Sequence, residues 1–172
     1  MRCKTIYLLA FICLFMVSCN EMDDGNHVDP ITINEKIDGE WGLMSLKMVD
    51  EVAKTNKLEP SEQILSTLFN YDNFRIKFNV DENRNPTSYE VTGDVPPLFA
   101  LNGYWRLSSD FQQSTGEPVR IYLYSDAQKT IKTDELRLTS VPGSNEEMEL
   151  QLVRTSGGTP FVSYTFKLSA IN

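Results

Sequence analysis

Residues 162–169 read Val-Ser-Tyr-Thr-Phe-Lys-Leu-Ser, and the alternation of apolar and polar residues in this stretch indicates the fold class most clearly. Successive side chains of a β-strand point to opposite faces of a sheet, so a strand that is buried on one side shows a period of two. The residues between the apolar ones are serine, threonine and lysine, which suit a solvated face. The stretch therefore predicts a half-buried strand, whose inward residues are Val162, Tyr164, Phe166 and Leu168.

The same alternation recurs through most of the chain after residue 31. Segments rich in turn-forming residues, such as 81–86, 142–145 and 156–160, separate most of the alternating runs. Evenly spaced short strands with hairpin-like connections predict an all-β, antiparallel up-and-down β-barrel of about eight strands, because closure leaves no open edge. We assign residues 35–172 to this barrel. The predicted strands are 41–49, 74–80, 88–92, 104–108, 119–124, 135–139, 148–152 and 162–169.

Residues 60–69, Pro-Ser-Glu-Gln-Ile-Leu-Ser-Thr-Leu-Phe, interrupt the period of two. Ser61 is a candidate helix cap, and the apolar residues at 64, 65, 68 and 69 would share one helix face. The segment predicts a short helix between the first two strands. We expect it to cover one mouth of the barrel and to plug that mouth with Leu68 and Phe69.

Residues 1–18 have the three parts of a secretory signal peptide: basic Arg2 and Lys4, an apolar run from 6 to 17, and a small residue, Ser18, before Cys19. The apolar run has 12 residues and is too short to span a bilayer core as a helix. A small residue directly before a cysteine resembles the lipobox of bacterial lipoproteins. That resemblance implies cleavage before Cys19 and acylation of its thiol and new amino group. An ordinary signal peptide or an uncleaved membrane anchor is the alternative.

Residues 19–34 predict a lipidated, acidic tether without apolar periodicity. The cluster at residues 20–25, Asn-Glu-Met-Asp-Asp-Gly, resembles the surface-export signal of Bacteroidetes lipoproteins, which implies the outer face of the outer membrane. A solvated tether on the periplasmic face is the alternative. The chain carries a formal charge of −8, which becomes −10 when the leader with Arg2 and Lys4 is removed. Such a balance argues against nucleic acid as a partner.

A Gly-x-Trp sequence, Gly39-Glu40-Trp41, opens the first predicted strand after a segment that could form one helical turn. Together with the lipobox, the acidic tether and the strand pattern, it resembles the lipocalin-like lipoproteins of Bacteroidetes, many of which are domains of unknown function. The resemblance implies that Trp41 closes the barrel floor and that Arg154 packs on its ring. A second Gly-x-Trp stands at 103–105. The chain departs from lipocalins in having no cysteine pair to staple the barrel.

Catalytic chemistry is restricted by the scarcity of histidine and cysteine. The single histidine, His27, lies in the tether, and the three cysteines are at or before position 19. A Ser-His-Asp triad, a histidine-ligated metal site and a cysteine nucleophile are therefore not expected in the folded part, and no cofactor or metal is expected. The densest acidic group suits a solvated edge better than a pair of catalytic carboxylates. It comprises Asp134, Glu135, Glu146, Glu147 and Glu149.

Aromatic residues are the candidates for ligand contact. Structural packing is the alternative role of these residues, because large rings are common in small barrel cores. The candidates are Phe99, Tyr104, Trp105, Tyr122 and Tyr124.

We expect a non-catalytic binding protein that takes a small apolar molecule in the barrel or a glycan at its mouth. An accessory protein that docks on an outer-membrane partner without a small ligand is the alternative, and a carboxylate-based hydrolase is a more distant one. The packing of the barrel interior distinguishes the ligand-binding protein from the docking protein. A barrel packed solid would count against a ligand carrier, and the residues that would fill it are Phe74, Phe78, Leu136, Leu138, Leu150 and Phe166.

Overall fold

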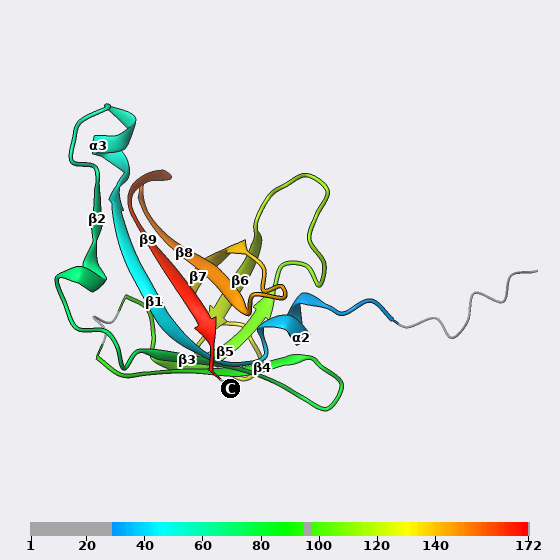
Figure 1. Cartoon of the computed structure of the whole chain (residues 1–172). Coiled ribbons are helices and arrows are strands. Elements are labelled where there is room, and N and C mark those ends of the chain that lie inside the picture. Colours follow the sequence, from blue (N-terminus) through cyan, green and yellow to red (C-terminus); the bar gives the residue numbers. More distant parts are fainter. Residues whose placement is uncertain (1–28, 95–97, 172) are drawn as a thin grey trace, which may run out of the picture. The chain divides into compact units, whose positions relative to one another are not determined.

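A computed structural model describes residues 29–94 and 98–171 and has an antiparallel β-barrel at its centre (Figure 1). Eight strands follow one another around the barrel in chain order, and the last pairs with the first, so that the ring closes. A ninth strand, β2, hydrogen-bonds to β1 outside this ring. The strands are β1 (Gly39–Asp50), β2 (Glu62–Ile64), β3 (Arg75–Val80), β4 (Pro86–Thr92), β5 (Asn102–Leu107), β6 (Val119–Tyr124), β7 (Lys132–Ser140), β8 (Glu147–Ser156) and β9 (Thr159–Ala170).

The structure confirms the all-β barrel and each of the eight predicted strands. Residues 119–124 form β6 with the predicted bounds, whereas β1 and β9 are longer than predicted. Residues Ile31–Asn172 form one compact unit that contains these strands. Strand β2 was not predicted, because its three residues are exposed and show no alternation.

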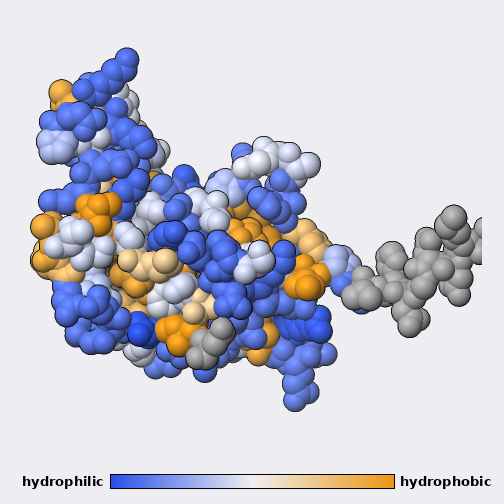
Figure 2. Space-filling view, in the orientation of Figure 1, coloured by the Kyte–Doolittle hydropathy of each residue, from blue (hydrophilic) through white to orange (hydrophobic). Residues whose placement is uncertain are grey.

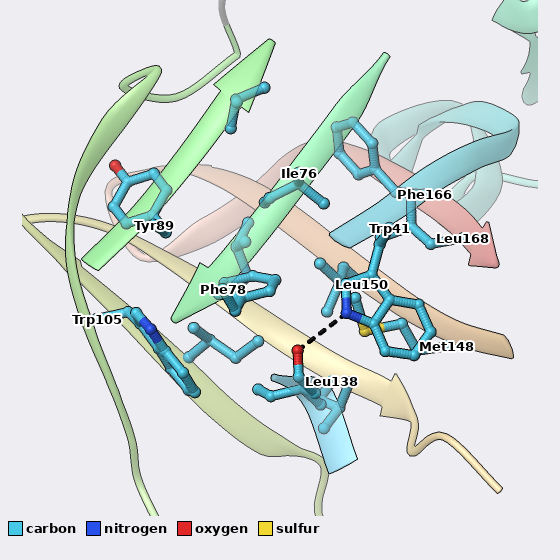
Figure 3. Packing of buried hydrophobic residues seen from close by; sticks show 14 of the residues in the cluster. Trp41, Ile76, Phe78, Tyr89, Trp105, Leu138, Met148, Leu150, Phe166 and Leu168 are labelled. Carbon is cyan, nitrogen blue, oxygen red and sulfur yellow. Dashed lines mark hydrogen bonds between the residues drawn. The ribbon is translucent and has the colours of Figure 1, made fainter. Parts of the chain in front are cut away.

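The floor of the barrel is closed by the short helix α2 (Ile33–Ile37). Thr32 and Glu35 form a reciprocal capping box: the Thr32 amide donates to Glu35 Oε2 over 2.8 Å, and the Glu35 amide donates to Thr32 Oγ1 over 3.3 Å. The indole Nε1 of buried Trp41 donates to the carbonyl oxygen of Ile37 over 2.9 Å (Figure 3). Trp41 therefore ties the helix to the first barrel strand. The helix begins within the stretch assigned to the tether.

Large side chains fill the interior (Figure 3), and the indole nitrogens of both tryptophans have hydrogen-bond partners. Trp105 is fully buried; its Nε1 donates to the carbonyl oxygen of Asn79 over 3.0 Å, and its ring meets Phe78 edge-on at 5.1 Å. Each large apolar side chain that is buried stabilises the fold by about 1.5–3 kcal/mol. The core therefore supplies stability that a chain without disulfides in this domain needs.

Strand β1 changes partners halfway along its length. Residues 39–42 pair with β3, and a β-bulge follows between Leu43 and Ser45. Beyond the bulge, residues 47–49 pair with β2 on that edge, while β9 continues along the other edge. Thus β1 and β3 separate at the end of the barrel opposite α2. We call this end the mouth.

The short helix predicted between the first two strands is present as α3 (Glu51–Thr55), which follows β1 directly. Its cap is Asp50, whose Oδ1 accepts the amides of Val52 and Ala53 over 3.0 and 2.8 Å. The segment 60–69 that was expected to form this helix instead contains β2 and the 3-10 helix η2 (Leu65–Thr67). The unpaired edge of β1 offers backbone hydrogen bonds to β2, and this tertiary pairing overrides the local helical pattern.

Substitution of Gly103 tests the packing of the barrel wall. A Cβ atom at Gly103 would lie 2.3 Å from the backbone oxygen of Tyr124, so Gly103→Ala must push β5 and β6 apart. We expect a loss of about 2 kcal/mol in the free energy of unfolding, measured by urea denaturation with tryptophan fluorescence. The control is Gly143→Ala, because its Cβ would meet nothing closer than 3.9 Å. Equal stability of the two variants would contradict the close approach of β5 and β6.

Candidate ligand-binding pocket at the barrel mouth

The middle of the barrel is filled by side chains. The six residues expected to decide this point, Phe74, Phe78, Leu136, Leu138, Leu150 and Phe166, are all at least 98% buried. An eight-stranded barrel is just wide enough for side chains to fill its interior. At these six positions, side chains occupy the interior space that a ligand would need.

A pocket of about 550 Å³ opens instead at the mouth, where β1 and β3 separate. Met48 of β1 and its register partner Tyr164 of β9 form one wall. The chain from η2 to Tyr71 forms a second wall, and the turn after β4 forms a third. The described residues that line it are Met48, Leu65, Phe69, Tyr71, Gly93, Asp94, Leu98 and Tyr164.

Two aromatic rings give the pocket its apolar character. Phe69 and Tyr71 stack with ring centres 5.7 Å apart and planes 26° from parallel. Tyr71 is buried, which raises the pKa of its phenol, whereas Phe69 is 53% exposed. Leu68 is 56% exposed and does not line the pocket. The expectation that Leu68 and Phe69 plug the mouth is therefore wrong, because the chain before them is held on β1 at the side of the opening.

Hydrogen bonds to the 98–101 segment place it at the mouth. Arg154 donates to the carbonyl oxygen of Leu98, and Tyr89 Oη donates to that of Ala100 over 3.0 Å. Burial, and next the charge of Asp134, raise the pKa of Tyr89 to about 12, so its hydroxyl stays protonated as a donor. Phe99 packs edge-on against Phe166 at 5.9 Å. Phe99 is thus packed against the core, next in the chain to Leu98 of the pocket lining.

Arg154 does not pack on Trp41, and this part of the lipocalin resemblance is corrected. Arg154 pairs with Val162 on β9, whereas Trp41 pairs with Ala170, eight residues along the same strand, or roughly 26 Å at the usual rise. Its guanidinium forms an ion pair with Asp134 at 2.7 Å. Arg154 therefore belongs to the mouth. Gly39 and Trp41 lie at the floor, where Gly39 begins β1 with φ +117°.

The remaining aromatic candidates lie away from the mouth pocket. Trp105 is part of the filled interior. Tyr104, Tyr122 and Tyr124 project from the outer side of β5 and β6, since they alternate with the inward residues Trp105 and Leu123. Cations cover two of these rings: Arg106 Cζ lies 5.6 Å from the centre of the Tyr122 ring and 5.5 Å from that of Tyr124. Only Tyr104 has no such cation within the described residues.

Side chains of the acidic group predicted as a solvated edge form ion pairs and hydrogen bonds. The pairs are Asp134 with Arg154, Glu135 with Arg120 and Lys132, Glu147 with Lys167, and Glu149 with the Thr139 hydroxyl.

Within residues 29–94 and 98–171, no three His, Cys, Asp or Glu side chains are placed to hold a metal ion. No helix in the same ranges is long and apolar enough to cross a membrane.

The leader (1–18), Cys19, the acidic cluster and His27 lie outside the described residues. A family model described as "Domain of unknown function (DUF5004)" matches residues 18–169, which include all strands of the sheet except the last residue of β9, Ala170. No curated protein and no solved structure matches the chain.

The anchoring of the 98–101 segment can be tested with Arg154→Met, which keeps the aliphatic stem and removes the charge. It leaves Asp134 and the Leu98 carbonyl without this donor, so we expect a loss of about 1 kcal/mol in stability and faster amide exchange at 99–101. Arg120→Met is the control, because Arg120 pairs with Glu135 on the exposed outer face. Unchanged exchange at 99–101 would show that Arg154 does not hold this segment.

Proposed function

The chain belongs to the family described as "Domain of unknown function (DUF5004)", and we propose that it is a lipid-anchored binding protein that catalyses no reaction. Its barrel takes a small apolar molecule at the mouth. The leader and Cys19 supply the anchor, and the acidic cluster behind Cys19 directs the protein to the outer face of the outer membrane. Fold alone does not assign a ligand, so the proposal rests on the mouth pocket.

The observation that carries the proposal is the contrast between a filled interior and an apolar, half-open mouth. A volume of about 550 Å³ lies in the range of small-molecule sites. Phe69 leaves about half of its ring in water, and a ligand that covers it would gain the free energy of burying that surface. The polar groups at the wall, the Asp94 carboxylate and the two tyrosine hydroxyls, would orient the polar end of such a molecule.

The anchoring part of the proposal is supported by the residues before position 25. A basic start, a short apolar run and Ser18-Cys19 agree in length and position with a lipoprotein leader. Several acyl chains on one residue would hold the protein to a bilayer, since each buried CH₂ contributes about 0.8 kcal/mol.

A docking protein is the second candidate, and strand β2 favours it. Among the described strands, β2 has one neighbour, β1, so its other edge offers free backbone groups to a partner strand. Exposed Leu58, Ile64 and Leu68 lie along the same stretch. In Figure 1 this stretch and α3 project beyond the barrel, and Figure 2 shows hydrophobic surface on the same side.

The uncharged fluorophore N-phenylnaphthylamine tests the mouth pocket in protein that begins at residue 20. We expect saturable binding, and at least tenfold weaker binding by Phe69→Ser, because the serine removes the exposed ring of the pocket wall. Phe111→Ser is the matched control, since Phe111 is similarly exposed but belongs to the loop beside Asp110, which contacts α2. Absence of saturable binding, or equal loss in both variants, would sink the apolar-ligand proposal and leave docking.

Metabolic labelling with an alkyne fatty acid tests the anchor in a host with lipoprotein processing. We expect label on the wild type and none on Cys19→Ser, because the thiol is the acylation site. A variant with Glu21, Asp23 and Asp24 changed to alanine should keep the label but lose accessibility to protease on intact cells. An unlabelled wild type would refute the anchor; unchanged accessibility of the triple variant would refute the export signal.

A further inference from the structure

A second pocket, of about 420 Å³, lies on the outside of the barrel over β4 and β5. Its lining differs from that of the mouth, because amide and hydroxyl side chains dominate it. Register pairing places Ser88 of β4 beside Tyr104 of β5, and Glu90 beside Asn102, so these side chains share one face. The polar and aromatic residues of its lining include Asn79, Ser88, Glu90, Asn102, Tyr104 and Ser125.

A guanidinium is held next to this pocket without a carboxylate partner. Arg106 follows Tyr104 by two residues on β5, so it points outward from the same face roughly 7 Å further along. The rings of Tyr122 and Tyr124 support it at 5.6 and 5.5 Å. Within the part of the chain that the structure describes, Arg106 forms no ion pair with a carboxylate. Its fork of N–H donors is thus oriented but available.

A second cation adjoins the first. Lys129 reaches back from the β6–β7 turn and donates to the carbonyl oxygen of Pro86, which is two residues before Ser88 on β4. Burial, and next the charge of Arg106, lower the pKa of Lys129, while Asp81 raises it. Two like charges are therefore close together at one end of the pocket, in a protein whose net charge is strongly negative.

The acids around the pocket do not cancel this charge. Glu90 stands at the opposite end of the pocket from Arg106, where Lys77 of β3 is its register partner. Asp81 lies near Lys129 and keeps its negative charge, while its Oδ1 accepts the amides of Asn83 and Asn85 over 2.9 and 2.8 Å. Arg106 and Lys129 together outweigh the single charge of Asp81, so the Arg106 end keeps a net positive charge.

We propose that this outer face binds an acidic saccharide. Its carboxylate pairs with Arg106 and Lys129, its hydroxyls bind Asn102, Ser88 and Ser125, and a sugar ring packs against Tyr104. The guanidinium fork matches a carboxylate in two parallel hydrogen bonds. A small anion would need only the two cations, whereas the hollow lined by amides and hydroxyls provides donors and acceptors for a polyhydroxylated ligand. This site is separate from the mouth pocket and does not depend on it.

NMR titration of ¹⁵N-labelled protein from residue 20 tests the site with tetragalacturonate, neutral maltotetraose and sodium acetate. We expect tetragalacturonate to shift amides of 102–106, Ser125 and Lys129 saturably. Arg106→Met should weaken this binding at least tenfold, whereas Lys54→Met, which removes one charge on distant α3, should not. Asn102→Ala should weaken the binding of tetragalacturonate and leave the binding of acetate unchanged. Phe69→Ser at the mouth should bind like the wild type.

Four outcomes would overturn the proposal. Three of them are no saturable shifts with tetragalacturonate, equal effects of Arg106→Met and Lys54→Met, and acetate binding as tightly as tetragalacturonate. The last would reduce the site to a plain anion site. If neutral maltotetraose bound as tightly as tetragalacturonate, Arg106 and Lys129 would have no role in binding, and the proposal would also fail. Circular dichroism of each variant confirms that the barrel is intact before binding is compared.

Discussion

The closure of the sheet by β9 on β1 is the contact on which the rest of the structure depends. Residues 162–170 of β9 pair with residues 41–50 of β1, across more than half of the chain length. Without this pairing both strands would be open edges, and the inward faces of all eight strands would lack a common interior. Closure also sets the diameter, and with eight strands the diameter leaves room for side chains such as Trp105 and Phe166 but not for a large cavity.

The same closure explains why the openings are at the rim and on the outer face. Strand β1 stays with β9 from Trp41 to Asp50 but leaves β3 after Gly42, so the wall splits toward the mouth. Strand β2 covers the freed edge of β1, and the chain that follows brings Phe69 and Tyr71 to the opening. The apolar pocket is thus a consequence of one strand having two partners on the same edge.

The barrel presents two kinds of surface that suit different chemistry. The mouth is apolar and aromatic, whereas the outer face of β4 to β6 carries amides, hydroxyls and cations supported by tyrosine rings. The outer face is built mainly on paired strands, which hold side chains more rigidly than loops do, whereas at the mouth only Met48 and Tyr164 of the described lining belong to strands. A protein tethered to a membrane by its first mature residue, as we propose, would leave these surfaces free for ligands in the surrounding medium.

Local residue patterns alone determined the eight strands of the barrel, because alternation is set by side chains two residues apart and does not depend on the rest of the fold. The resemblance to lipocalins also implied Trp41 at the floor, where its indole Nε1 donates to the carbonyl oxygen of Ile37 in α2. Tertiary structure decided what lies far apart in the chain: Arg154 meets Asp134 and Leu98 instead of Trp41, and residues 62–64 become β2. Among the aromatic candidates, register and barrel closure placed Trp105 inside and Tyr104 outside, because neighbours on one strand point in opposite directions and only the closed sheet defines which direction is buried.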